Sequence, residues 1–442
     1  MVSTRLGHNA TGPASFKEAK VVRRSPHRRR FGSAVVLIVC GAVLAGCSPN
    51  AFPVASKTET LSPQHMNPGS DELRAAHLFT PTSGWVLTVN RLLITGDGGR
   101  TWSDVTPPSI VTTGSALRDA TFGLPGSAPA PNASVLETAF FLNPSRGWVV
   151  RSIRVNMGSD QAPLDLLTTS DRGKHWSVQR IIATIPFDTP GPVYLTFIDA
   201  LRGWLVVDQG SHSGFMRYTG FRTTDGGLTW TTLSYPQSAP VLFINQLDGF
   251  SANGADGPTS GTYVTHDGGW TWAGLVVPPA GASATAPLFQ LPVFSDDRNG
   301  VLGGGMPDRS GGTASEVFYK TSDGGRSWSL AGTVPNPNPP SNAHLASVVN
   351  AKVWLAAFLG PGPIAGRTYT RLKATHNGGR SWQWMPTVLS GALMNEISFA
   401  GSTGWAIVVD AGCLGFKTDC FTNFGLFQTI DAGAHWVRLS VT

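Results

Sequence analysis

One short acidic pattern recurs along the chain, and its residue types are those from which a catalytic or ligand-binding site could be built. In YKTSDGGRSWSLA (319–331), Thr321, Asp323, Gly325 and Trp328 form the pattern Thr-x-Asp-x-Gly-x-x-Trp. A carboxylate beside a hydroxyl and a glycine turn could serve as a ligand or as a catalytic group. The pattern occurs seven times, with its acid position at Asp97, Asp171, Asp225, Asp267, Asp323, Asn377 and Asp431.

The same residue types also predict a purely structural role for this pattern, called the box below. The glycine two residues after the acid suits a turn with positive φ. The carboxylate can accept hydrogen bonds from turn amides and from the threonine hydroxyl, and Asn377 can accept them without charge. The tryptophan is large enough to fill a gap between neighbouring sheets. We therefore weigh a structural box against a catalytic or ligand-binding one.

A second signal precedes each box and organises the chain into seven units. It is a glycine followed by an apolar strand, clear at Trp85, Trp148, Trp204 and Trp405, and weaker at Phe250, Val301 and Trp354. Successive boxes lie 74, 54, 42, 56, 54 and 54 residues apart. Each unit reads as four short strands with almost no helical periodicity. The pattern predicts an all-β fold, a seven-bladed β-propeller of four-stranded antiparallel blades over residues 71–442.

The repeated box resembles the Asp-box, or BNR repeat, of bacterial sialidases, sortilin-type receptors and some glycoside hydrolases. With the Gly-Trp strand before it, each unit is most similar to the photosystem II stability/assembly factor family, over residues 73–442. The resemblance implies that the boxes lie on outer turns away from the central channel, which favours the structural interpretation. It also implies a non-catalytic scaffold that binds protein partners and helps to assemble or stabilise a membrane complex.

The first seventy residues predict export and lipid attachment. Basic residues precede the apolar run FGSAVVLIVCGAVLAG (31–46), which is placed like the core of a secretion signal. Leu44-Ala45-Gly46-Cys47 matches a bacterial lipobox, so Cys47 is the expected lipidation site. The predicted parts are a signal peptide (1–46), then a lipidated cysteine and flexible tether (47–70), which would anchor the protein on the extracytoplasmic side of the membrane. An ordinary signal peptide or membrane anchor is the alternative, and Sec or twin-arginine export stays open.

The positive net charge belongs to the export segment. The whole chain has 33 basic and 27 acidic residues, giving +6, and residues 1–46 hold eight of the basic residues and one of the acidic ones. The remainder carries 25 − 26 = −1. A nearly neutral domain gives no reason to expect a nucleic-acid partner.

Two cysteines remain beyond the predicted lipidation site. Cys413 and Cys420 lie in GCLGFKTDC, and in an exported protein they predict a disulfide, with two free thiols as the alternative. No histidine stands beside them at ligand spacing, so we expect no metal site, and no motif implies an organic cofactor.

Variable loops gather on the face opposite the boxes, where binding residues are most often found. The candidate binding residues there are Arg154, Arg217, Tyr218, Arg309 and Arg367. The alternative is that these loops, rich in glycine, proline and serine, are tolerated insertions. We expect a monomer with a protein partner at the membrane.

Two other functions remain open from the sequence. A sialidase-like glycosidase needs a tyrosine nucleophile or paired carboxylates, yet none of the six tyrosines has a recognisable catalytic context and no Phe-Arg-Ile-Pro motif precedes the first box. The paired acids of a xyloglucanase-type hydrolase can come from distant blades, so spacing does not test them. Glycan or cell-wall binding without hydrolysis would use the same loop face, where Phe215, Tyr218 and Tyr369 supply aromatic rings.

Overall fold

The computed structural model describes residues 72–441 in part. It describes these residues except 109–132, 155–160, 187–191, 213–214, 237, 253–260, 281–286, 308–312, 338–342, 362–367, 394–396 and 415–418. The predicted signal peptide, the tether and Cys47 therefore lie outside the described residues. In the part described, no helix is long and apolar enough to cross a membrane.

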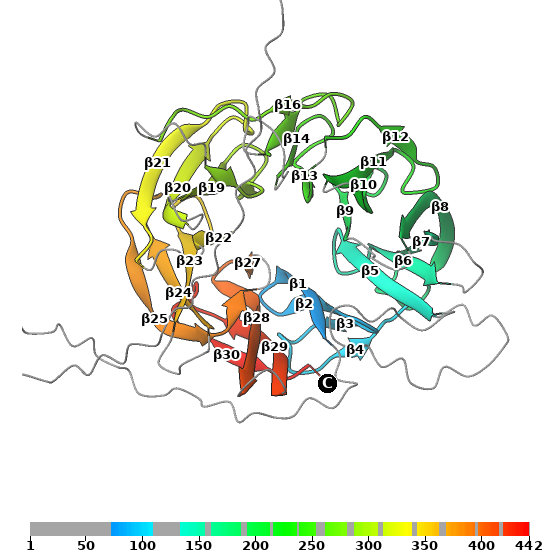
Figure 1. The fold of residues 1–442 in the computed structure, drawn as a ribbon. Helices are drawn as coiled ribbons and strands as arrows, with labels where there is room; N and C mark the ends of the chain where they lie inside the picture. Colours follow the sequence, from blue (N-terminus) through cyan, green and yellow to red (C-terminus); the bar gives the residue numbers. More distant parts are fainter. Residues whose placement is uncertain are drawn as a thin grey trace, which may run out of the picture. The chain divides into compact units, whose positions relative to one another are not determined.

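Seven antiparallel sheets stand around a ring, which confirms the predicted seven-bladed β-propeller (Figure 1). Each sheet is built from consecutive strands, the first of them innermost, so every blade is one hairpin-linked unit of the sequence repeat. The strands of blades 1 to 3 are β1 (Leu73–Thr80), β2 (Ser83–Thr88), β3 (Leu92–Thr95), β4 (Ser103–Asp104); β5 (Ala133–Phe141), β6 (Gly147–Arg154), β7 (Gln161–Thr169), β8 (Ser177–Pro186); β9 (Val193–Phe197), β10 (Gly203–His212), β11 (Phe215–Thr223) and β12 (Thr231–Leu233).

Blades 4 to 7 follow the same plan, but blades 5 and 7 have an innermost strand split into two short pieces. Both pieces pair with the second strand of the blade, so the blade keeps four layers. The strands are β13 (Val241–Phe243), β14 (Gly249–Ser251), β15 (Tyr263–Thr265), β16 (Ala273–Gly274); β17 (Leu288–Phe289), β18 (Val293–Phe294), β19 (Gly300–Pro307), β20 (Thr313–Thr321), β21 (Ser329–Pro335); β22 (Ala343–Val348), β23 (Trp354–Pro361), β24 (Thr368–Thr375), β25 (Gln383–Ser390); β26 (Ala392–Leu393), β27 (Ser398–Ala400), β28 (Thr403–Leu414), β29 (Asp419–Thr429) and β30 (Val437–Leu439).

The second strand of each blade is buried on both faces because neighbouring blades cover it on either side. In β6, Trp148, Val149 and Val150 are all at most 1% exposed. Strands covered on both faces read as continuous apolar runs, and not as alternating ones. The sequence Gly-Trp-Val-Val at the start of β6 is such a continuous apolar run.

The glycine that opens the second strand is required by the first strand. In five blades it stands opposite a phenylalanine of its own first strand, whose ring covers it. At Gly203, an added Cβ would lie 2.5 Å from a ring carbon of Phe197. Any larger residue there would displace the ring, so a small residue and a large one are coupled across the strand pair.

Blade 6 departs from this pattern and corrects one alignment made from the sequence. The KVWLA segment was matched to Gly-Trp with Trp354 at the tryptophan position. In the structure Trp354 lies opposite the box threonine Thr375, as Gly203 lies opposite Thr223. Trp354 therefore occupies the glycine position and Leu355 the tryptophan position. The sequence comparison failed here because register is fixed by strand pairing, and a one-residue slip turns each side chain to the other face.

Among the described residues, the first and last blades contact each other through side-chain packing and hydrogen bonds. The Trp102 and Trp405 rings lie 5.5 Å apart, and the Trp102 indole Nε1 donates to the Ser440 carbonyl at 3.0 Å. The Leu78 amide donates to Ser398 Oγ at 2.9 Å. Each terminal sheet contains only consecutive strands, so among the described strands none is exchanged between the two ends.

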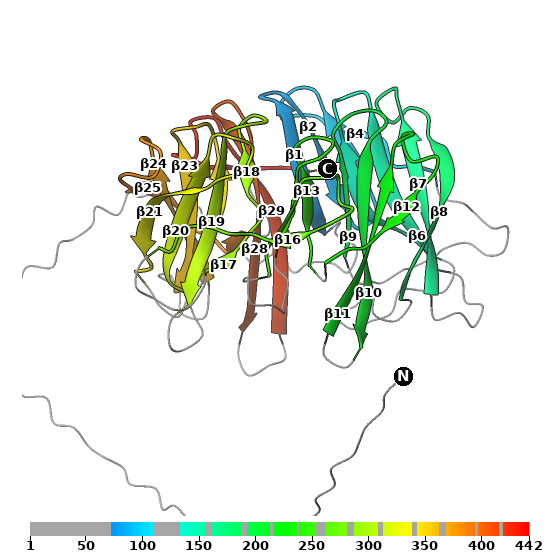
Figure 2. The ribbon, with the colours of Figure 1, turned by 90° about the horizontal axis from the view of Figure 1, so that it is seen from above.

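The propeller presents two different ends. The boxes lie between third and fourth strands, beside the turns between first and second strands, as the hydrogen bond from the Gly98 amide to the Thr82 carbonyl shows. The second strands end and the third strands begin at the opposite end, as the lower ends of β10, β11, β28 and β29 show in Figure 2. We call these the box face and the loop face.

Candidate functional site

The box acids are occupied within their own turns. Asp323 Oδ1 accepts from Thr321 Oγ1 at 2.7 Å and from the Ser327 amide at 3.0 Å, while Oδ2 accepts from Ser327 Oγ at 2.5 Å. These hydrogen bonds, led by the Ser327 hydroxyl, lower the pKa of Asp323 to about 2. The threonine hydroxyl donates in the same way to the acid of six copies and to the amide oxygen of Asn377 in the seventh, at 2.7–3.0 Å. A carboxylate used in this way is a poor proton donor and has few lone pairs left for a ligand.

Asn377 reproduces the turn without a charge. Its side-chain carbonyl accepts from Thr375 Oγ1 and from the Ser381 amide, and its Nδ2 donates to Ser381 Oγ at 2.8 Å. The following glycines take positive φ, 82° at Gly325 and 86° at Gly379. Turn geometry therefore accounts for these residues in the charged and the neutral copies alike.

The predicted binding-face residues do not form one site. Arg217 is exposed and Tyr218 half-buried on β11, and as consecutive strand residues they point to opposite faces of blade 3. Arg154 ends β6, with its backbone opposite Ala133. Arg309 and Arg367 lie outside the described residues, as do the side chains of Arg154, Cys413 and Cys420.

The two predicted disulfide cysteines are directly opposite each other in the backbone. The register of the hairpin β28–β29 pairs Cys413 with Cys420. Directly opposed residues of an antiparallel pair have Cα separations within the range that disulfides span. The disulfide remains a prediction, since only the backbone is described here.

The structure gathers three tyrosines and one aspartate on one face of blade 3, in its loop-face half. Asp208 on β10 lies opposite Tyr218, and Val206, two residues earlier on the same face, lies opposite Tyr194. Tyr235 follows β12 and covers Gly220, which is also opposite Val206. All four side chains thus face blade 4. We call them the tyrosine cluster: Tyr194, Asp208, Tyr218 and Tyr235.

Burial and mutual proximity keep these phenols protonated. Burial, then the neighbouring Tyr218 and Asp208, raises the pKa of Tyr194 to about 12. Burial and the charge of Asp208 raise the pKa of Tyr218, and burial raises that of Tyr235, although its hydroxyl is 2.9 Å from Ser251 Oγ. Neutral phenols can donate hydrogen bonds and present apolar ring faces, whereas none of the three is activated as a phenolate nucleophile.

Sequence reasoning found only Tyr218 of this cluster. Tyr194 and Tyr235 come from segments outside the nominated loops, and Asp208 sits in an apolar strand. One signal was available: Asp208 lies four residues after Trp204, so the alternation of a strand places both on one face. The pairing registers of β9 and β11 were needed to add the tyrosines.

A second polar cluster lies on the box face between blades 4 and 5. The buried carboxylate of Asp248 accepts from His266 Nδ1 at 2.7 Å, Arg326 Nη2 at 2.9 Å and Asn245 Nδ2 at 2.8 Å. Burial alone would raise the pKa of Asp248, but the hydrogen bonds and the charge of Arg326 lower it overall. With all its partners supplied by neighbouring turns, Asp248 ties the two blades together.

No group of three potential metal-ligating side chains is found among the described residues. The carboxylates of the boxes are separated by blade and are bound by hydroxyl, amide and, at Asp171 and Asp431, histidine ring groups of their own turns. The described part of the chain thus presents one aromatic and acidic cluster on the loop half, and repeated structural turns on the box face.

Comparison with known proteins finds similarity only to solved structures, at low sequence identity. No family model matches the chain, and no curated protein matches it. Among solved structures, the GH74 xyloglucanase from Xanthomonas campestris is similar at 14% identity, with a TM-score of 0.49 over 82% of this chain and 52% of that one. An ancestral GH74 enzyme has 11% identity and a TM-score of 0.37, covering 84% and 62%. A PL25 ulvan lyase has 9% identity and a TM-score of 0.33, covering 84% and 83%.

These comparisons correct the functional prediction. The chain spans about half the length of the GH74 xyloglucanase, and at these identities the likeness extends to the fold alone. The neighbours are named as glycoside hydrolases and a polysaccharide lyase. The predicted non-catalytic scaffold for protein partners, and the prediction that the chain is not an enzyme, are not borne out: the matched structures are named as carbohydrate-active enzymes, which was the predicted alternative. The chain is a seven-bladed β-propeller.

Proposed function

We propose that this protein is a carbohydrate-active propeller that holds a sugar chain at the tyrosine cluster. The observation that carries the proposal is the convergence of Tyr194, Tyr218 and Tyr235 around Asp208 on one face of blade 3. Ligand sites combine apolar and aromatic lining with a few directional polar groups, and a sugar ring offers both an apolar C–H face and hydroxyls to match.

The four residues have different roles in this proposal. Tyr194 and Tyr218 are half-buried, so their rings and hydroxyls contact the sugar. Asp208 is 1% exposed and lies directly across from Tyr218, which makes it a positioning residue that orients the phenol. Tyr235 donates to Ser251 and packs edge-on against Trp272, with ring centroids 5.3 Å apart, so it fixes the far wall.

Cleavage of a glycosidic bond would need more than this cluster. Hydrolases of most families place two carboxyl groups about 5–10 Å apart across the bond. The tyrosine cluster supplies one, and its raised phenol pKa values argue against a sialidase-like tyrosine nucleophile. Sugar binding is thus the activity that the cluster supports directly, and hydrolysis is a separate outcome of the same test.

The test is calorimetric titration with xyloglucan and ulvan oligosaccharides, run alongside an assay for newly released sugar ends. We expect Tyr194→Ala and Tyr218→Ala each to weaken binding at least tenfold. Arg217→Ala is the matched control, because it alters the adjacent residue on the opposite face of the same strand. If no oligosaccharide binds, or if the tyrosine variants bind like the parent with unchanged thermal stability, the proposal fails.

The family resemblance and the export signal belong to the same proposal. The hydrogen bonds within each Thr-x-Asp-x-Gly-x-x-Trp turn support membership of the Asp-box propellers. The lipobox ending in Cys47 supports a propeller tethered by residues 47–70 to the outer side of a membrane, where polysaccharides are encountered. Mass spectrometry of the mature N-terminus would detect the acylated cysteine.

A further inference from the structure

Most neighbouring blades are joined by a stacked aromatic pair or by an edge-on one. Trp148 of blade 2 lies flat on Phe197 of blade 3, with centroids 3.8 Å apart and planes 7° apart. Trp204 stacks on Phe243 in the same way, at 3.6 Å and 5°. Both indoles also donate from Nε1 to a box glycine carbonyl of the next blade, at 3.1 and 2.9 Å. In these two interfaces the space between the blades near the box face is filled by the aromatic pair.

Between blades 5 and 6 the stack is made by other residues, Phe318 on Trp382 with centroids 4.6 Å apart, and both rings are missing at the positions of Trp148 and Phe197. Val301 follows Gly300 and lies opposite Lys320, as Trp148 follows Gly147 and lies opposite Thr168. Val348 ends the first strand of blade 6 in the place that Phe197 has in blade 3. Two valines replace an indole and a phenyl ring, and a cavity of about 280 Å³ lies beside them.

Trp354 lines this cavity but does not fill it. From the glycine position of blade 6 its indole packs towards blade 5, against Val301 and Phe318. It is 1% exposed, and its Nε1 has no hydrogen-bond partner. Trp85, Trp230, Trp328 and Trp405 share the unpartnered N–H, so that feature alone identifies no site. In Trp354 it adjoins a cavity, and a buried N–H without an acceptor costs free energy that a ligand oxygen would recover.

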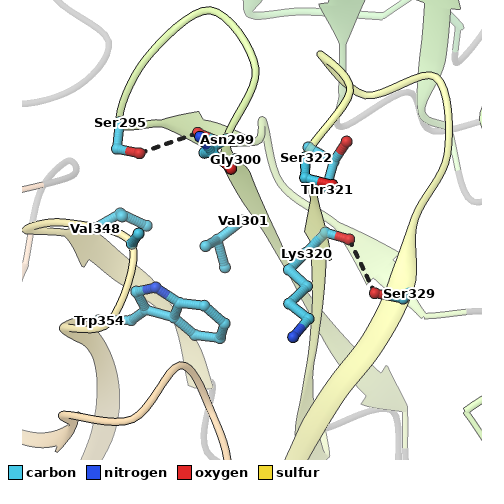
Figure 3. Close-up of a pocket in the computed structure, with 11 residues that line it drawn as sticks. Ser295, Asn299, Gly300, Val301, Lys320, Thr321, Ser322, Ser329, Val348 and Trp354 are labelled. Carbon is cyan, nitrogen blue, oxygen red and sulfur yellow. Dashed lines mark hydrogen bonds between the residues drawn. The ribbon is translucent and has the colours of Figure 1, made fainter.

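The opposite wall supplies a positive charge. Figure 3 shows Lys320 on β20 and Trp354 on β23 on either side of the cavity, with Val301 between them. Ser295 and Asn299 form its upper edge, and the Ser295 hydroxyl already donates to the Asn299 carbonyl. The Ser329 hydroxyl is bound to the Lys320 carbonyl. Among the described lining residues, the side-chain donors left without an intramolecular partner are the exposed Lys320 ammonium, the Ser322 hydroxyl and the Trp354 indole N–H, beside the apolar Val301 and Val348.

We infer that this blade 5–6 cavity binds a small organic carboxylate with a flat or compact apolar body. The Lys320 ammonium matches an ionised carboxylate, and bonds between ionised partners are the stronger kind, while the indole N–H lies on the Val348 side of the cavity (Figure 3). The valines and the indole face match an apolar ring of about the size of benzene, which a cavity of this volume accommodates. The inference is independent of the carbohydrate proposal, because it uses the other face and another pair of blades.

The test uses benzoate as the probe and benzyl alcohol as its neutral counterpart, measured by saturation-transfer NMR and calorimetry on the whole protein. We expect benzoate to bind, and benzyl alcohol to bind at least tenfold more weakly. Lys320→Gln should remove that preference, and Val301→Trp should abolish binding by filling the space. Lys174→Gln, an exposed cation in the box of blade 2, is the matched control and should leave binding unchanged.

The outcomes separate a site from a packing defect. Loss of benzoate binding in both cavity variants, with the Lys174 variant unaffected, supports the inference. If benzoate does not bind the parent, or binds Val301→Trp as it binds the parent, the inference is overturned. Should Val301→Trp not fold, Lys320→Gln and Val301→Phe provide the same discrimination.

Discussion

The blade 2–3 and blade 5–6 interfaces solve one packing problem in opposite ways. In the first, Trp148 stacks on Phe197, and Gly203 makes room for the phenyl ring. In the second, Val301 and Val348 are small, and Trp354 occupies the glycine position. The large residue has moved from one side of the interface to the other. Total volume is nearly conserved, but shape is not, and the remaining void is the cavity beside Lys320.

In both interfaces large side chains fill most of the space between the blades, although they stand at different positions of the repeat. The filled volume is therefore kept more closely than the residue type at any one position. The blade 5–6 interface also contains Glu316, which is fully buried and alternates with Phe318 along β20 on the face towards blade 6. Both its carboxylate oxygens lack a hydrogen-bond partner. A void and a buried acid thus occur in one interface that departs from the repeat, although Glu316 does not line the void.

The largest expected effect comes from removing the tryptophan that stands at the glycine position of blade 6. Trp354→Gly restores the glycine of the other blades but leaves Val348 too small to cover it. Loss of a buried indole should cost about 3–5 kcal/mol of unfolding free energy. Adding Val348→Phe should recover at least 1 kcal/mol of this, about the value of an aromatic contact. Urea denaturation of the single and double variants measures the coupling between positions 348 and 354. If the two changes in unfolding free energy simply added, the proposed compensation between these positions would be contradicted.

A smaller effect is expected from imposing the blade 6 residue on the regular interface. Phe197→Val removes the ring beneath Trp148, and no tryptophan from blade 3 replaces it, because Gly203 occupies that position. We expect a loss of about 2–3 kcal/mol in the free energy of unfolding. The conservative Phe197→Leu should lose less. If Phe197→Val left the free energy of unfolding unchanged, the stacked pair would contribute nothing that neighbouring side chains could not replace by repacking.

Glu316 sharpens the comparison through pH. Burial raises its pKa well above 4.5, so the folded protein holds a proton that the unfolded chain releases. The stability contribution of this group is therefore complete below pH 4.5 and decreases as pH rises towards the folded pKa. We expect Glu316→Gln to raise the melting temperature at pH 8 by a few degrees and to change it little at pH 4.5. An equal shift at both values would exclude titration as the cause.

The smallest effect concerns the two boxes that flank the blade 5–6 interface. Hydrogen bonding lowers the pKa of Asp323 to about 2, whereas Asn377 does not titrate. The contribution of Asp323 is present above pH 3.8 and is lost as pH falls through 2, the opposite direction from Glu316. Asp323→Asn should cost about 1 kcal/mol at pH 7, since Asn377 shows that an amide fits the turn. The cost should vanish at pH 2 in urea titrations, and a constant cost would point to altered geometry.

Much of the fold was predictable because its signals are local. The period of the box, the glycine turn and the apolar strand before it all arise within one blade, and they determined the blade count, the strand order and the two ends of the propeller. The hydrogen bonds of the box also follow from residues at most four positions apart. Such contacts need no knowledge of the neighbouring blade.

The sites were decided by contacts that cross between strands and blades. The alternation of one strand could place Asp208 beneath Trp204, but Tyr194 and Tyr235 joined it only through the registers of other strands. Trp354 looked like a Gly-Trp tryptophan until pairing with Thr375 placed it one position away. The sequence by itself determined a seven-bladed propeller with structural boxes. The tertiary structure alone decided which faces carry the tyrosine cluster and the cavity, because a shift of one residue reverses a side chain and no local pattern records that shift.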